Sequence, residues 1–386
     1  MRELHVRTPE QLDELCGLLR GSPWLALDTE FMRERTYNAR LCLLQVCDGK
    51  TAASVDPLQV ESLAPLLEII HDPAVTKVFH AARQDLEIFL QLWGRLPAPV
   101  FDTQLAATLL GLGEQVGYAR LVEELLGVTL DKGHTRTDWS RRPLEEAQLR
   151  YALDDVIYLG RIFPLLQQRL QEQGREQWLQ EDFRLLSDPA TYRLDPDRMW
   201  RRVKGWQRLK GVQLAVLQSL AAWREEQARR ADKPRRWIIK DDPLLEMARR
   251  RPRDTEQLSR IRGLEAGTLK RHGETLVGLI VASTARPRSE WPREKAPPPR
   301  LTPNQEAIAD LLGCALRLLA DEAGITPSAL AGRRELERLA SGEREGLDLL
   351  HGWRLKLAGA ALLEVLEGKR APRMTRGRLQ LQQLEV

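Results

Sequence analysis

The stretch "WLALDTEF", residues 24–31, ends a short apolar run with two carboxylates, Asp28 and Glu30. The run is typical of a β-strand, in which side chains two positions apart project from the same face. Two neighbouring carboxylates cannot be buried on such a face without a partner. A solvated strand end is the common explanation of a lone pair, so the interpretation depends on acids elsewhere in the chain.

The sequence around this stretch alternates strand and helix patterns through about residue 195. Two apolar runs turn at Asp48-Gly49, and helical periods then alternate with short apolar segments. We therefore expect an α/β domain over residues 1–195, built on a mixed sheet with helices on both faces. Residues 143–174 predict a long helix that Pro164 breaks or kinks.

Composition indicates a soluble protein of two or three domains. The chain has 386 residues, 42% of them hydrophobic and 30% charged. No run reaches the roughly 18–20 apolar residues of a membrane span, and the N-terminal residues do not resemble a signal peptide. The four cysteines are scattered, which predicts reduced thiols and a cytoplasmic location.

Beyond residue 195 the pattern becomes helical. Two amphipathic blocks, 205–284 and 301–370, flank a Pro- and Arg-rich linker at 285–300. A weak echo between residues 244–252 and 335–343 suggests two copies of one small helical domain. The polar tail, 371–386, is expected to be loosely held.

Further acids change the interpretation of the opening pair. Asp85 lies in a helix that follows a strand, and Tyr151 and Asp155 are neighbours on one helical face. Four carboxylates on a strand and two helices suit a two-metal site for Mg²⁺ or Mn²⁺, which prefer oxygen ligands. We find no Ser–His or Cys–His pair with comparable support.

The segments "LDTEF", "FHAARQDLEIF" and "YALDDV" resemble the three exonuclease motifs of the DEDD superfamily, in its tyrosine-containing branch. The two helical blocks resemble helicase-and-RNase-D C-terminal (HRDC) domains. The whole order resembles the bacterial ribonuclease D family. That resemblance implies a ribonuclease H-like fold and metal-dependent 3′→5′ hydrolysis of RNA, with transfer RNA precursors as the substrate class.

The resemblance also implies a role for each motif residue. Asp28, Glu30 and Asp155 would hold one divalent ion, and Asp28 would serve a second ion with Asp85 reaching it through water. Glu30 would also accept a hydrogen bond from the terminal 3′-hydroxyl. Tyr151 would orient the attacking water, although a phenol with a pKa near 10 is a poor general base. Thr29, between the two acids, points to the other face and is given no chemical role.

Two nearby residues receive structural interpretations instead. Asp154 adjoins Asp155, but one step along a helix turns a side chain about 100° away. We therefore do not expect it to be a ligand. Asp102 is expected to cap a helix rather than bind metal.

Substrate contacts are expected from a basic segment at 229–251. For a second basic segment at 131–143, next to the predicted site, contact with substrate phosphate and a solvated loop pinned by Trp139 both remain open. For His80, a position at the mouth of the site and a strand-end histidine bonded to the backbone both remain open. Trp237 could stack a base, but Ile238 and Ile239 after it favour a core position. The candidate RNA contacts are His80, Lys132, Arg136, Arg141, Arg235 and Arg236.

Two rival functions stay open. A DNA exonuclease would use the same carboxylates, because only contacts to the 2′-hydroxyl distinguish the two sugars. A nucleic-acid-binding protein with an inactive nuclease would be expected to lack one of the acids, and all four are present. The oligomeric state is not fixed by the sequence, and we favour a monomer.

Overall fold

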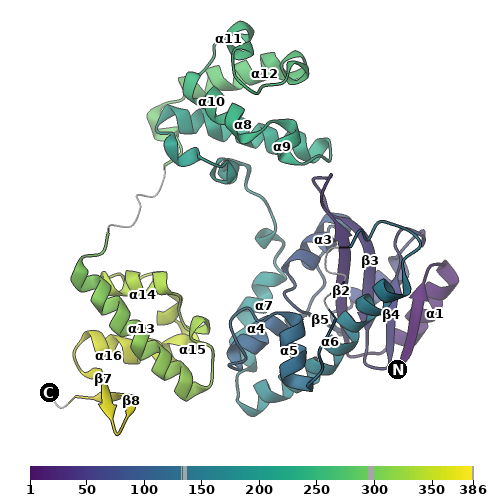
Figure 1. The fold of residues 1–386 in the computed structure, drawn as a ribbon, viewed down its shortest axis with the longest axis vertical. Helices are drawn as coiled ribbons and strands as arrows, with labels where there is room; N and C mark the ends of the chain where they lie inside the picture. Colours follow the sequence, from purple (N-terminus) through teal and green to yellow (C-terminus); the bar gives the residue numbers. More distant parts are fainter. Residues whose placement is uncertain (132, 134–136, 294–299, 385–386) are drawn as a thin grey trace. The chain divides into compact units, whose positions relative to one another are not determined.

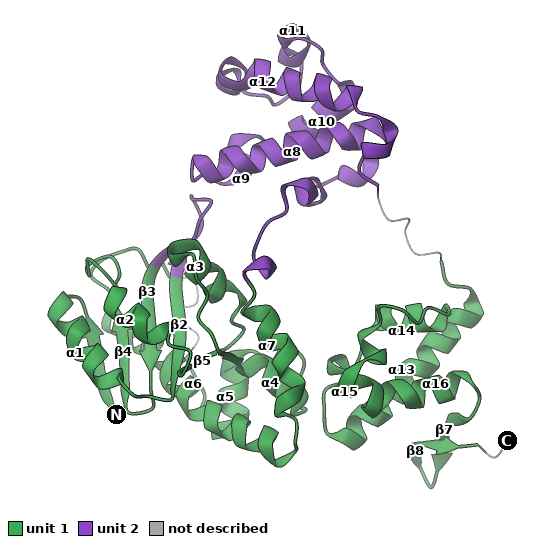
Figure 2. Cartoon of the chain, turned by 180° about the vertical axis from the view of Figure 1, so that it is seen from behind, with its two compact units in different colours: residues 1–30, 42–188, 298–386 green, residues 31–41, 189–297 purple. Residues whose placement is uncertain are grey.

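The structure is a computed structural model that describes residues 1–131, 133, 137–293 and 300–384. The chain divides into two compact units, and each is described by itself (Figure 2). Residues 1–30, 42–188 and 298–386 form the first unit, and residues 31–41 and 189–297 form the second.

A mixed six-stranded sheet organises the first part of the chain, in the order β1-β4-β3-β2-β5-β6 (Figure 1). β1 pairs parallel with β4, β3 pairs antiparallel with β4, and β5 pairs parallel with both β2 and β6. The sequence did not predict β1. The strands are β1 (Arg2–Val6), β2 (Trp24–Met32), β3 (Arg40–Cys47), β4 (Thr51–Val55), β5 (Thr76–Phe79) and β6 (Val100–Asp102).

Both faces of this sheet are covered, as the sequence predicted. Along β2, Ala26 belongs to a buried cluster that includes Val156 and Phe163 of α6, while the alternate residues Leu25 and Leu27 are also fully buried. Alternating side chains of a strand point to opposite faces, so protein must cover both. The helices are α1 (Pro9–Leu19), α2 (Ala64–Ile70), α3 (Arg83–Trp93), α4 (Thr103–Leu109), α5 (Tyr118–Leu126), α6 (Glu146–Glu172) and α7 (Gln180–Leu186).

Pro164 does not break the long helix, so the break that the sequence allowed is wrong, whereas a kink at this position stays a prediction. α6 runs without interruption from Glu146 to Glu172 with Pro164 inside it. A proline removes only one hydrogen bond of the helix. Phe163, Leu166 and Leu170 stay buried around it, so packing offsets the loss.

The remaining helices form two bundles, each with a core of its own. None of the helices in the described ranges is both long and apolar enough to cross a membrane. The first bundle contains α8 (Val212–Arg230), α9 (Arg235–Ile238), α10 (Asp241–Arg250), α11 (Thr255–Ser259) and α12 (Ala266–Ala285). The second contains α13 (Pro303–Ala323), α14 (Arg333–Ala340), α15 (Gly352–Arg354) and α16 (Ala360–Leu366).

The expected loose tail is a β-hairpin instead. β7 (Arg370–Thr375) and β8 (Arg378–Gln383) pair antiparallel and pack on α13 and α16. The alternation of Leu379 and Leu381 with glutamines is the sequence signal for β8, and the polar composition of the segment hid it.

The second bundle shares the first unit with the sheet domain, and direct contacts connect them. The backbone N–H of Thr326 donates to the Thr108 carbonyl at 3.1 Å. The rings of Trp178 and Trp353 stack with centroids 4.6 Å apart. The Arg175 guanidinium donates to backbone carbonyls at the end of α13. Sequence patterns do not report such contacts, because their partners are far apart in the chain.

Candidate active site

Three carboxylates meet where β2 faces α6. Asp28 and Glu30 project from β2 on the face of Ala26, and Asp155 projects from α6, which packs on that face. Each contributes an oxygen atom, and these oxygens all lie within 4.8 Å of one another. The structure thus brings together two sequence motifs that are separated by 125 positions, from 30 to 155.

Burial is the largest cause that raises the pKa of each acid in this group, and nearby carboxylates add to it. Burial, followed by the charges of Asp155, Asp85 and Glu30, raises the pKa of Asp28 well above its ordinary value. Burial, followed by the charges of Asp155 and Asp85, raises the pKa of Glu30 to about 8. Burial and the neighbouring Asp154 raise the pKa of Asp155 to about 7. The site therefore disfavours a full set of carboxylates unless positive charge joins it.

The donor set fits a hard divalent cation. Within the described residues, none of the three clustered acids forms an ion pair with lysine or arginine, so no described basic side chain neutralises their charge. Closely spaced carboxylate oxygens of this kind are the ligands that Mg²⁺ and Mn²⁺ prefer. Asp28, Glu30 and Asp155 are the residues that would hold such an ion.

Asp85 lies near this cluster but outside the group of oxygens within 4.8 Å. It is buried on the first turn of α3, and burial raises its pKa to about 7. The hydroxyl of Thr29 donates a hydrogen bond to its carboxylate, which opposes that rise. The sequence assigns Thr29 no role in the chemistry, and the structure adds this supporting contact to Asp85. Strand alternation turns the Thr29 side chain away from Asp28 and Glu30. Only the tertiary fold brings the Asp85 carboxylate within hydrogen-bonding distance of its hydroxyl.

Tyr151 lies one helical turn before Asp155, and its hydroxyl hydrogen-bonds to the Asp155 carboxylate. The buried Trp139 packs beside it, with ring centroids 6.1 Å apart. Asp154 turns away and pairs with Arg150 at 2.7 Å, as expected for a residue that is not a ligand.

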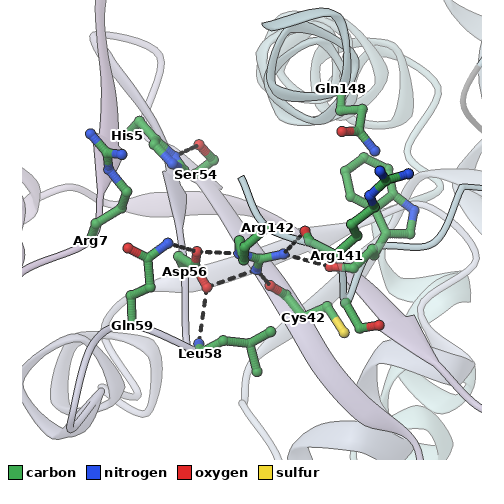
Figure 3. A network of polar contacts seen from close by, with 12 residues as sticks. His5, Arg7, Cys42, Ser54, Asp56, Leu58, Gln59, Arg141, Arg142 and Gln148 are labelled. Atoms are coloured by element: carbon green, nitrogen blue, oxygen red, sulfur yellow. Dashed lines mark hydrogen bonds and ion pairs between the residues drawn. The ribbon is translucent and has the colours of Figure 1, made fainter. Parts of the chain in front are cut away.

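Arg142 anchors the segment that carries Trp139 (Figure 3). Its guanidinium binds both oxygens of the fully buried Asp56, at 2.6 and 2.8 Å. It also donates to the backbone carbonyls of Cys42 and Trp139, each at 2.7 Å. The sequence placed Arg142 among the basic residues near the site but gave no sign of Asp56, which lies 86 positions away.

Tyr118 is a further residue beside the site that sequence reasoning missed. Its hydroxyl donates to the backbone carbonyls of Asp154 and Asp155, which ties α5 to the helix that carries the site. Burial, with the nearby charges of Asp155 and Asp28, raises its pKa well above the ordinary value. It has no local sequence signal, since helix α5 is an ordinary amphipathic helix.

His80 does not fit the prediction of an RNA contact. Its Nδ1 lies 2.9 Å from the Thr103 hydroxyl and its Nε2 lies 3.0 Å from the Val116 carbonyl, so both ring nitrogens are engaged. Burial lowers its pKa, which favours the neutral ring. The alternative of a strand-end histidine satisfied locally describes it. Asp102 caps α4 by accepting from the backbone N–H of Gln104, as predicted.

The other candidate RNA contacts divide into three groups. Arg141 and Arg236 are exposed and stay candidates. Lys132 and Arg136 lie outside the described residues. Arg235 instead donates to the Glu225 carboxylate through Nε and Nη2 and lies over the ring of Tyr37. Because its charge is already paired with Glu225, Arg235 is a weaker candidate than Arg236, and its contact with RNA stays a prediction.

Trp237 is exposed, contrary to the core position that we favoured. Its exposed fraction is 61%, whereas Ile239 is buried and Ile238 is packed against the core of the first bundle. The short helix α9 points the two isoleucines inward and leaves the indole outside. A base-stacking role is therefore open to Trp237.

Sequence families agree with this fold and site. Residues 4–171 match the 3′–5′ exonuclease family, and residues 213–280 match the HRDC domain family. With the carboxylate cluster on β2 and α6, these matches define the protein as a 3′→5′ exonuclease with an appended HRDC region.

Individual relatives identify the family within this class of exonucleases. Ribonuclease D of Gluconacetobacter diazotrophicus is 42% identical over 368 residues, which cover 94% of this chain and 93% of that protein. Ribonuclease D of Acidiphilium cryptum is 42% identical over 379 residues, covering 97% and 95%. The crystal structure of Escherichia coli RNase D, described as an exoribonuclease involved in structured RNA processing, matches with a TM-score of 0.78 at 34% identity, covering 95% and 99%. This chain belongs to the ribonuclease D family and is a 3′→5′ exoribonuclease.

Proposed function

We propose that this exoribonuclease trims the 3′ ends of structured RNA precursors, transfer RNA precursors above all, with two divalent cations, Mg²⁺ or Mn²⁺. The observation that carries the proposal is the cluster of Asp28, Glu30 and Asp155, whose oxygens lie within 4.8 Å of one another. Similarity to a structured-RNA exoribonuclease over 95% of the chain supports the substrate class.

The acids divide between the two cations. Asp28, Glu30 and Asp155 would hold the first cation, and Asp28 would also serve the second, with Asp85 reaching it through water. Bound cations supply Lewis-acid stabilisation of the phosphoryl charge and favour deprotonation of the attacking water. Glu30 also accepts a hydrogen bond from the terminal 3′-hydroxyl, which restricts attack to the last phosphodiester.

Tyr151 positions the attacking water by its hydroxyl. The bond from this hydroxyl to Asp155 and the packing of Trp139 hold the ring in one orientation. A phenol is too weak a base at neutral pH to remove the proton, so its contribution is orientation. Arg142 fixes the segment that carries Trp139 and acts as a positioning residue.

The site is tested by single isosteric substitutions. Asp28→Asn and Asp155→Asn are each expected to abolish trimming in Mg²⁺ while leaving RNA binding in Ca²⁺ nearly unchanged. Asp154→Asn is the matched control, because it makes the same chemical change one residue away on the same helix, at a side chain paired with Arg150. Full activity of either of the first two variants would contradict the proposed site.

The substrate is tested with four labelled molecules. These are a transfer RNA precursor with a 3′ extension, an unstructured RNA, the DNA version of that oligomer, and a 5′-labelled RNA that reports direction. We expect stepwise shortening from the 3′ end of the precursor until the mature end is reached. Equal rates on DNA and RNA would favour the rival DNA exonuclease.

The first helical bundle is proposed to hold the RNA. Lys233, Arg236 and Lys240 are exposed and lie around the exposed indole of Trp237. Lysine and arginine neutralise backbone phosphates without sequence preference, and an aromatic ring stacks any base. Arg141 is proposed to contact the RNA nearer the carboxylates.

We also propose the domain organisation, location and state of the protein. The domains are an exonuclease domain at 1–195, HRDC-type domains at 205–284 and 301–370, and a linker at 285–300. Limited proteolysis with mass spectrometry should cut first in that linker. We propose a cytoplasmic monomer, which cell fractionation and light scattering after size-exclusion chromatography would test.

A further inference from the structure

The β7–β8 hairpin has two chemically different faces. Cross-strand partners lie on the same face of a hairpin, so the register Arg373↔Gln380 and Thr375↔Arg378 defines a polar face. The register Met374↔Leu379 and Pro372↔Leu381 defines an apolar face. The hairpin is therefore amphipathic, although its sequence looks uniformly polar.

Unneutralised positive charge gathers on the polar face and at the turn. Arg373, Arg376 and Arg378 are exposed, and residues 370–384 contain no acid. In the described part of the chain, no ion pair involves these three arginines. By contrast, Lys369 and Arg370 at the base pair with Glu367 and Glu364, each at 2.6 Å.

The turn keeps an arginine where the backbone disfavours it. Arg376 and Gly377 both have positive φ, 51° and 77°, and together form the two-residue connection between the strands. Such turns favour Asn, Asp or Gly at the first position, and another residue costs about 1 kcal/mol or more there. An arginine kept at the tip of the hairpin despite this backbone strain indicates that its positive charge has a function.

The hairpin is attached to the second bundle at its base. Leu381 packs against the core of the second bundle. The backbone N–H of Leu384 donates to the Lys369 carbonyl at 2.7 Å and closes the base. A rigid support lowers the entropy lost when long side chains bind a partner.

We propose that Arg373, Arg376 and Arg378 form a second RNA contact, which binds the phosphate backbone of the RNA substrate. This inference rests on the proposed function and adds a binding element beyond the first helical bundle. Arginine forks match phosphate oxygens in pairs, and Gln380 on the same face offers an amide donor. An acidic protein is the competing partner, and the salt dependence of RNA binding separates the two.

The test compares two variants that remove equal charge. Arg373→Ala/Arg378→Ala removes two free cations from the polar face. Arg333→Ala/Lys369→Ala is the control, since these exposed cations are already paired, Arg333 with Asp310 and Glu337 and Lys369 with Glu367. Affinity for a structured RNA is measured in Ca²⁺ by fluorescence anisotropy across a range of salt concentrations.

Loss of two phosphate contacts should weaken binding roughly tenfold near 0.1 M salt and reduce the slope of log K against log salt by about 1.4–1.8. The control should bind like the wild type. The single variant Arg376→Gly should reduce the slope of log K against log salt by ~0.7–0.9 relative to the wild type. Its thermal stability should be equal or higher, because glycine tolerates positive φ. This variant separates loss of charge from loss of the hairpin.

An unchanged slope in the Arg373→Ala/Arg378→Ala variant would overturn the proposal, and so would an equal loss in the control. Trimming of a short single-stranded RNA is followed in parallel. Failure of the wild type there would count against the proposed function, whereas normal trimming with an unchanged slope would count against the hairpin alone.

Discussion

Cation binding should be strongly pH-dependent, because the acids that hold the cation are partly protonated without it. The pKa of Glu30 is raised to about 8 and that of Asp155 to about 7. Each must lose its proton to act as a ligand, so binding releases protons. The perturbation is a titration of Mg²⁺ into the metal-free protein at pH 6, 7 and 8.

The size of the effect follows from the two pKa values. At pH 6 both carboxyls are mostly protonated, whereas at pH 8 Asp155 is ionised and Glu30 is about half ionised. Each carboxyl that must release its proton weakens cation binding about tenfold for every pH unit below its pKa. The Kd for Mg²⁺ should therefore fall on the order of 100-fold or more from pH 6 to pH 8.

The stability of the metal-free protein should decrease as pH rises, whereas its affinity for the cation should increase. These acids have folded-state pKa values above their unfolded values near 4, so the folded state binds more protons in between. Stability is therefore greatest below about pH 4 for these groups and falls as pH rises towards 8. Cation at about 100 times Kd should restore about 2.7 kcal/mol. That corresponds to a Tm increase of about 5–11 °C for a domain of this size.

Calorimetry in buffers of different ionisation enthalpy counts the released protons, and differential scanning fluorimetry follows Tm. Asp155→Asn should lose most of the pH dependence together with most of the affinity. Asp154→Asn should keep cation binding and proton release, but because the charge of Asp154 helps raise the pKa of Asp155, its pH dependence should shift to lower pH. Equal Kd values at pH 6 and pH 8, with no proton release, would refute the link between the carboxylate cluster and cation binding.

Three further predictions concern residues outside the cluster. Arg142→Ala leaves the buried Asp56 without its cation and should cost about 3–5 kcal/mol in urea unfolding, and a loss below about 1 kcal/mol would refute the anchor. Thr29→Val removes the donor that lowers the pKa of Asp85, so the acid limb of the pH–activity profile should move to higher pH. An unmoved limb would contradict that role. Trp237→Ala should weaken RNA binding by about 1–3 kcal/mol without lowering Tm, since the indole is 61% exposed, and unchanged affinity would exclude stacking.

The sequence was sufficient for the catalytic motifs and for most of the fold, because these depend on local spacing. Asp28 and Glu30 share a strand face by their separation of two, and Tyr151 and Asp155 share a helical face by their separation of four. Such periodicities are properties of the backbone and do not depend on where the strand or helix packs in the tertiary structure. The same logic explains the cap at Asp102.

Local patterns failed where opposing preferences compete within a short segment. Pro164 predicted a break, but buried neighbours on both sides keep α6 continuous. Isoleucines after Trp237 predicted a core position, but a one-turn helix has room to bury only one side. The terminal segment was too polar to suggest a hairpin, although Leu379 and Leu381 alternate with polar residues along β8.

Tertiary structure alone decided which groups support the site. Asp56 reaches Arg142 across 86 positions and Thr29 reaches Asp85 across 56, and no periodicity connects residues at such distances. The same is true of the pKa values, which depend on burial and on charges that the fold brings close. The sequence by itself determined the acids that we propose hold the cation, whereas the packing of α6 and α3 against the sheet decided their distances, protonation and supporting contacts. The physical reason is that residue spacing fixes direction along one element, while only packing fixes distance between elements.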